Sequence, residues 1–344
     1  MGVRGFFGLL HGAELQEAIT SIRLSHEPRS EPLYFAIDLG NFKSIVHHLV
    51  PDFSDGWSPF TITNWFHDFI QTFNNSNVFF IFYSEGKSVE DALRKTSSTH
   101  NMQERLLAES RDPLSKEYKH DDPSSLILLL LLEALELNVS NPTHGNKLRL
   151  TKDEGDPYVA QCVASGEAYA VISNDSDFCF FPGCRLAFFK KRLNWKTAFE
   201  KIKRGQSVTL YIFDQSLFKN RYQMTDLELM TFAAMAGSDS TQHLVRDWPS
   251  SNHTHRLSRI LSQFRNSEFQ SQWLSYVKSN ELLEEAVCDT ISYYQKVGTE
   301  RWTGVTYESV ENVFDFFQEK NIQKFIQPHL RYSMTPAVIL QTLS

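Results

Sequence analysis

The chain has few cysteines, no long hydrophobic run and no excess of positive charge. Its four cysteines, none of them in a C-x-x-C pair, exclude a small disulfide-framed fold and give no sign of a zinc ribbon. The longest apolar run, at residues 126–132, is far shorter than the roughly 20 residues that span a bilayer. Because the first residues lack the apolar core of a signal peptide, we expect an intracellular protein with reduced thiols and no membrane association.

The charge balance is also informative. Lysine and arginine total 34 against 41 aspartates and glutamates, which gives a net charge of −7. This excludes a polycation, so binding to a nucleic acid would need a local basic patch.

The apolar residues, 41% of the chain, gather in short continuous runs that predict strands buried on both faces. These runs are Leu33–Asp38, Val78–Tyr83, Ala168–Ser173, Leu186–Phe189 and Val208–Phe213. Helical patterns between them cover Thr63–Asn74, Ser125–Leu137 and Asp156–Ala164. The alternation predicts an α/β fold with a mostly parallel sheet flanked by helices.

The second half of the chain is predominantly helical. Thr225 and Glu228 form a capping-box pattern before an apolar helix that ends at Gly237. Beyond it, helical patterns cover His255–Ser279 and Glu281–Tyr294. We therefore expect an α/β domain at residues 1–245 and a helical C-terminal region at residues 246–344. Within the first, the polar stretch 86–125 predicts a long excursion between two core elements.

Carboxylates fall where the predicted strands end. Asp38 closes the first strand, Glu85 follows the second, and Asp175 and Asp177 follow the third. Ligands of open α/β sheets bind outside the carboxyl ends of the strands. Three strands therefore end in or just before acids, at the carboxyl ends of the strands where a ligand site is expected.

Three further acids belong to the same set. Glu154 and Asp156 open the helix that leads into the third strand, and Asp239 follows Gly237. Clustered carboxylates raise each other's pKa unless cations neutralise them, and hard divalent ions prefer oxygen ligands. Two such ions about 4 Å apart stabilise both oxygens of an in-line phosphoryl displacement. Taken singly, each acid has a simpler interpretation: Asp156 before Pro157 as a helix cap, and the others as turn or loop acids.

These motifs, in this order and spacing, resemble the flap endonuclease/XPG superfamily over roughly residues 1–241. The segments that carry the resemblance are Met1–Phe6, Ala36–Asp38, Glu154–Asp156, Ile172–Asp177 and Ala236–Asp239. The resemblance implies a PIN-like fold, two Mg²⁺ or Mn²⁺ ions, and hydrolysis of phosphodiester bonds by metal-activated water. By position it implies these metal ligands: Asp38, Glu85, Glu154, Asp156, Asp175, Asp177 and Asp239. Of these, Asp38, Glu154, Asp175 and Asp177 are the central catalytic acids, and Gly2 would lie beside the nucleic acid.

The sequence differs from the usual motifs of this superfamily in two places. Glu85 stands where these nucleases usually have aspartate, and residues 241–248 lack the glycine turn of the usual helix-hairpin-helix. The missing hairpin, together with Glu154–Asp156 and the start of the chain, resembles the asteroid branch. That branch implies a structure-specific endonuclease for single-stranded, overhanging or branched DNA, acting in DNA repair. Two alternatives stay open: RNA as the substrate, and a catalytically weak scaffold that binds RNA or repair and transcription partners.

Two basic groups are candidates for holding phosphates. Lys87, Arg94 and Lys95 open the 86–125 excursion, which matches the position of the family's helical arch, and the second group is Lys190, Lys191 and Arg192. A solvated surface explains either group equally well. We expect the protein in the nucleus, although Lys190–Arg192 is only a weak basic cluster. Trp195 and Phe181 are either base-stacking or core residues.

Overall fold

The computed structural model describes residues 3, 5–12, 14–39, 59–85, 145–151, 155–189, 194–245, 248, 253–297 and 305–307. The predicted helix at Ser125–Leu137 and the excursion at 86–125 lie outside these residues. Within the described helices, none is long and apolar enough to cross a membrane.

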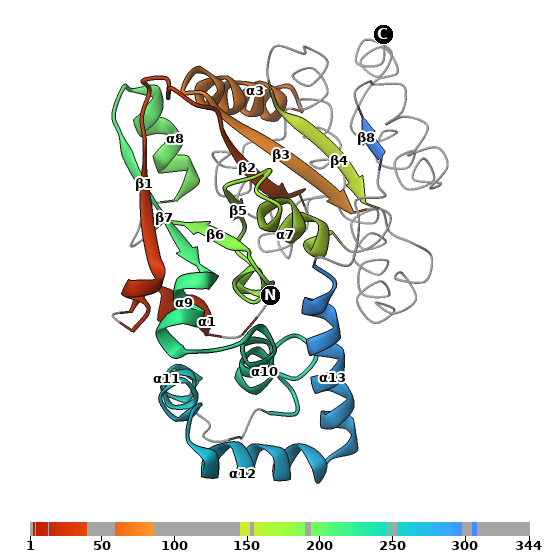
Figure 1. Ribbon diagram of the computed structural model, residues 1–344. Coiled ribbons are helices and arrows are strands. Elements are labelled where there is room, and N and C mark those ends of the chain that lie inside the picture. Colours follow the sequence, from red (N-terminus) through yellow and green to blue (C-terminus); the bar gives the residue numbers. More distant parts are fainter. Residues whose placement is uncertain are drawn as a thin grey trace, which may run out of the picture.

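The described residues form one eight-stranded sheet with the order β1-β7-β6-β5-β2-β3-β4-β8 (Figure 1). The strands are β1 (Ile19–Leu24), β2 (Leu33–Asp38), β3 (Val78–Glu85), β4 (Lys147–Thr151), β5 (Ala170–Ile172), β6 (Arg185–Phe188), β7 (Val208–Asp214) and β8 (Val305–Tyr307). The five central strands β6-β5-β2-β3-β4 run parallel to one another. β7 joins them antiparallel, and β1 and β8 form antiparallel edges. The mostly parallel sheet is confirmed, as are all five predicted strands.

Helices cover both faces of this sheet, which explains why its strands are apolar without alternation. Phe35 and Ile37 of β2 pack in one hydrophobic core with residues of α3 (Pro59–Asn75) and α8 (Trp195–Lys203). Ala36, between them, faces a second core with α1 (Phe6–His11), α7 (Asp156–Ala164), α9 (Gln215–Tyr222) and α10 (Asp226–Ala236).

The capping box of α10 is confirmed. Thr225 Oγ1 accepts a hydrogen bond from the Glu228 amide at 3.2 Å, and Glu228 Oε2 accepts from the Thr225 amide at 2.8 Å. Gly237 ends the helix with a φ of 98°, which favours glycine.

The single helix predicted over His255–Ser279 is wrong: two helices replace it. α11 (His253–Gln263) and α12 (Ser267–Lys278) are separated by a break at which Asn266 caps α12, its Oδ1 accepting from the Phe269 amide at 3.0 Å. The last described helix, α13 (Glu281–Gln295), agrees with the predicted Glu281–Tyr294.

The helices after residue 245 share a hydrophobic core with the helices before it. Leu257, Phe264, Leu283 and Val287 belong to the same buried cluster as Phe232 of α10. Arg256 also donates to the Met235 carbonyl at 2.7 Å. Figure 1 shows α13 running from α12 toward α7, so the chain returns to the sheet after leaving it. The domain boundary near residue 245 stays a prediction.

Candidate metal centre

Two neighbouring parallel strands end in buried carboxylates. Asp38 is the last residue of β2, and Asp175 and Asp177 follow β5, which pairs directly with β2. The three side chains are 4%, 8% and 6% exposed, respectively. Asp38 lies far from the other two in the sequence. Because β2 and β5 are parallel neighbours, all three aspartates lie at the carboxyl-terminal ends of the strands.

The segment after β5 is a hydrogen-bonded turn that fixes both of its aspartates. Ser173 Oγ accepts from the Asp175 amide at 2.9 Å, and Asp175 Oδ1 accepts from the Asp177 amide at 3.0 Å, which caps a short 3₁₀ helix (Ser176–Cys179). Ser176 Oγ donates to the Val3 carbonyl at 3.1 Å. These acids can therefore belong to a turn and also form a site, because the turn holds the Asp175 carboxylate and fixes the backbone of Asp177.

The negative charges of neighbouring acids act on Asp177. Burial, together with the charges of Asp175 and the exposed Asp239, raises the pKa of Asp177 to about 7. A divalent cation relieves such repulsion, and an oxygen-only donor set fits Mg²⁺ or Mn²⁺ rather than a softer ion. The carboxylate oxygens present are therefore the type of ligand that Mg²⁺ and Mn²⁺ prefer.

Asp156 does not cap α7. Gly155 occupies the cap position and Asp156 is the first helical residue, so the helix-cap interpretation is wrong. Its Oδ2 instead accepts a hydrogen bond from the hydroxyl of Tyr293 at 3.0 Å.

A tyrosine that the sequence analysis did not identify contacts the central acid. The hydroxyl of Tyr294 donates to Asp177 Oδ1 at 2.6 Å. Tyr293 and Tyr294 are adjacent in α13, and both contact members of the predicted ligand set. Burial and the Asp177 charge raise the pKa of Tyr294 well above its usual value, so the hydroxyl remains a donor.

The side chains of several predicted site residues lie outside the described part of the structure, so their places in the site stay predictions. Glu85 ends β3, beside β2, but only its backbone is described. The others lie outside the described residues: Gly2, Lys87, Arg94, Lys95, Glu154, Lys190, Lys191 and Arg192. In the part of the chain that is described, no three or more His, Cys, Asp or Glu side chains lie together as a group that could hold a metal ion.

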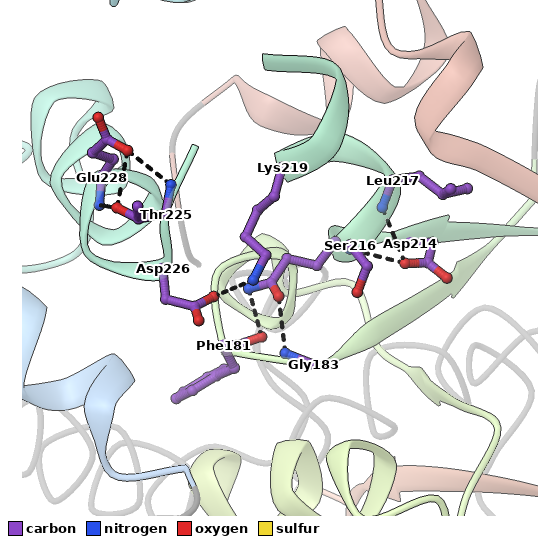
Figure 2. A network of polar contacts seen from close by, with 10 residues as sticks. Phe181, Gly183, Asp214, Ser216, Leu217, Lys219, Thr225, Asp226 and Glu228 are labelled. Carbon is purple, nitrogen blue, oxygen red and sulfur yellow. Dashed lines mark hydrogen bonds and ion pairs between the residues drawn. The ribbon is translucent and has the colours of Figure 1, made fainter. Parts of the chain in front are cut away.

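A buried glutamine holds the turn beyond the 3₁₀ helix. The two turn residues that it contacts, Phe181 and Gly183, are labelled in Figure 2. Gln215, at the start of α9, donates from Nε2 to the Phe181 carbonyl and accepts at Oε1 from the Gly183 amide, both at 2.8 Å. Phe181 in turn packs on the rings of Tyr293 and Tyr294, with centroids 5.3 and 5.1 Å away. Phe181 and Trp195 are both buried, which confirms their interpretation as core residues.

A second polar cluster lies beside α7, apart from these acids. Glu167 accepts hydrogen bonds from Arg149 at 2.6 and 2.7 Å and from Lys147 at 2.9 Å. Burial opposes ionisation of Glu167, but these cationic donors outweigh it and hold its pKa at about 2. Arg149 also donates to the Tyr83 hydroxyl at 2.8 Å, which ties β4 to β3.

Comparison with known proteins agrees with this architecture. Residues 151–239, which carry Asp156, Asp175, Asp177 and Asp239, match the XPG I-region family model. The catalytic core of Rad2 in complex with DNA substrate is similar with a TM-score of 0.53 and 14% identity, covering 95% of this chain and 100% of that chain. Flap endonuclease-1 from Methanococcus jannaschii gives 0.50 and 11%, covering 92% and 97%. No curated protein sequence matches the chain. The expected fold is therefore confirmed: the chain is similar in fold to these nucleases, and residues 151–239 within it match the XPG I-region model.

Proposed function

We propose that this chain is a metal-dependent, structure-specific nuclease that hydrolyses phosphodiester bonds in single-stranded, overhanging or branched DNA. The observation that carries the proposal is the convergence of buried Asp38, Asp175 and Asp177 at one sheet edge, inside a fold similar to nuclease catalytic cores. We place the protein in the asteroid branch, in the nucleus and in DNA repair.

The acids divide by position. Asp38, Asp175 and Asp177 would hold two Mg²⁺ or Mn²⁺ ions, Glu154 and Asp156 would share them, and Glu85 and Asp239 would complete the site. Bound ions would activate the attacking water and neutralise charge on the phosphate oxygens. The 3₁₀ turn would orient one of these carboxylates before an ion binds, because Asp175 Oδ1 accepts the Asp177 amide there.

The substrate class rests on the fold likeness and on the basic residues. The printed description of the Rad2 complex names a DNA substrate. Lys87, Arg94 and Lys95, together with Lys190, Lys191 and Arg192, would contact phosphates, and Gly2 would lie close to the strand. Such contacts predict affinity that falls as salt rises and depends little on sequence.

The test is cleavage of end-labelled oligonucleotides by purified protein with Mg²⁺ or Mn²⁺. The panel contains single-stranded DNA, a 5′ flap, a 3′ overhang, blunt duplex and single-stranded RNA. Asp175→Ala should lower the rate about a hundredfold or more, because a lost ligand removes several kcal/mol of transition-state stabilisation. Asp68→Ala is the matched control, since Asp68 is an exposed acid of α3 paired with Lys203.

Equal cleavage by wild-type protein and Asp175→Ala would contradict the nuclease. Folded wild-type protein with no cleavage of any substrate would also contradict it, and would favour a scaffold that binds RNA or other proteins.

A further inference from the structure

One face of α13 carries three hydroxyl side chains. Thr290, Tyr293 and Tyr294 have the spacing i, i+3, i+4, which places them on the same side of a helix. Two of the hydroxyls contact carboxylates of the candidate site: Tyr293 donates to Asp156 and Tyr294 donates to Asp177. These three residues are called the α13 hydroxyl face below.

The third hydroxyl reaches the segment that carries another acid. The hydroxyls of Thr290 and Ser238 lie 2.8 Å apart, and Ser238 directly precedes Asp239. Thr241 links the segment around Ser238 to the end of α10. Its hydroxyl donates to the Ala234 carbonyl at 2.8 Å and accepts from the Ser238 amide at 3.0 Å. Thus three acid-bearing segments, from three different elements, meet one helix.

The position of α13 is itself fixed by packing. Leu283 and Val287 are buried against the shared core, and Asn280 caps the helix by accepting from the Leu283 amide at 3.3 Å. The Tyr294 ring is 1% exposed and packs on Phe180 and Phe181, with centroids 6.0 and 5.1 Å away. A ring held this tightly presents its hydroxyl at a defined point, so the hydrogen bond orients the carboxylate rather than following it.

We propose that the α13 hydroxyl face positions the carboxylates that bind the divalent ions. The inference rests on the proposed function, since it assigns positioning residues to that site. A hydrogen bond to one oxygen of Asp177 sets the rotation of the carboxylate group. Partners of this kind, one step removed from the ion, change metal affinity about 10–100-fold when removed.

Metal binding by full-length protein tests the proposal without any assay of activity. Tyr294→Phe removes only the hydroxyl and keeps the ring. The Kd for Mn²⁺, measured by isothermal titration and by the rise in Tm with Mn²⁺ concentration, should weaken about tenfold or more. Tyr276→Phe is the matched control, because that hydroxyl donates to the Leu244 carbonyl at 2.9 Å, away from the acids, and its Kd should equal that of wild type.

The outcomes separate the two ideas. A Tyr294→Phe protein with a lower Tm in EDTA but an unchanged Kd would show a purely structural tyrosine and overturn the inference alone. A wild-type protein that binds no Mn²⁺ would overturn the proposed function and the inference with it. If Tyr294→Phe does not fold, Tyr293→Phe decides, because the half-buried Tyr293 makes the equivalent contact with Asp156.

Discussion

The hydroxyl of Tyr294 lies 2.6 Å from Oδ1 of Asp177, although 117 positions separate the two residues in the chain. The contact joins the last described helix to the turn after β5. It also shows that a helix outside the segment that matches the XPG I-region contacts the acidic site, since Asp177 belongs to that segment and Tyr294 follows it.

Asp177→Asn should stabilise the protein in EDTA at pH 8 and abolish its stabilisation by Mn²⁺. The buried carboxylate is repelled by Asp175 and Asp239, and the neutral amide removes that repulsion while its oxygen still accepts from Tyr294. We expect a gain of roughly 1–2 kcal/mol, or a few degrees in Tm. Differential scanning fluorimetry with EDTA and with Mn²⁺ measures both effects.

The same variant gives a pH dependence of defined sign. The folded pKa of Asp177 is raised to about 7 from its ordinary value of 3.8, so its protonated form stabilises the fold at low pH and this stability is lost as pH rises through 7. The advantage of Asp177→Asn in EDTA should therefore be full above pH 7 and vanish near pH 4. An advantage that grows toward low pH would contradict this electrostatic account.

Glu167→Gln should destabilise the protein at pH 7 by about 1–2 kcal/mol, a figure reduced because Glu167 is partly exposed. Its folded pKa of about 2 lies below the ordinary value of 4.5, so its contribution is full above pH 4.5 and is lost as pH falls toward 2. Urea unfolding across this range measures the difference. Glu200→Gln, in an exposed pair with Arg204, should change stability by little.

Gln215→Ala should cost about 2–4 kcal/mol. The change leaves the Phe181 carbonyl and the Gly183 amide without their side-chain partner and opens a cavity at a fully buried position. Chemical unfolding should show a lower midpoint with an unchanged slope. Ser216→Ala, at the exposed next position, provides the control and should be within about 0.5 kcal/mol of wild type.

Two glycine substitutions should have opposite signs. Gly237→Ala should cost more than about 1 kcal/mol, because its φ is 98° and a Cβ would lie 3.3 Å from Gln242 Cα. Gly8→Ala lies within α1, where a Cβ meets nothing within 4 Å, and should be neutral or stabilise by up to about 1 kcal/mol. Thermal unfolding of the two proteins beside wild type measures both effects; a stabilising Gly237→Ala would contradict the role of its left-handed backbone.

The central strands were predictable because they are buried on both faces. Leu33–Asp38 was predicted with its observed bounds, since four of its residues are buried in succession. β1 was missed because its first five residues are exposed or half-buried, so its letters carry no continuous apolar run. β4 was missed for a related reason: Lys147 and Arg149 alternate with leucines, and their charges are satisfied by Glu167 only in the fold.

Acids at strand ends were predictable because their positions follow from local order along the chain. The α13 hydroxyl face was not, since the five helices α8 to α12 lie between Asp177 and α13, and only their packing brings Tyr294 back to the acid. The repeated hydroxyl spacing at Thr290, Tyr293 and Tyr294 was a visible signal. On the sequence alone, however, it is equally typical of a helix side that faces solvent.

The α13 hydroxyl face has a consequence for how relatives of this chain are judged active or degenerate. The XPG I-region match ends at residue 239, before α13 begins. A survey that counts acids in that region would score two proteins as equally intact even if one had lost its tyrosines. A protein that keeps its acids but binds metal poorly, because its tyrosines are gone, would then be recorded as having an intact site. The tyrosines of α13 should be examined together with the acids when an active lineage is distinguished from one that keeps only the fold.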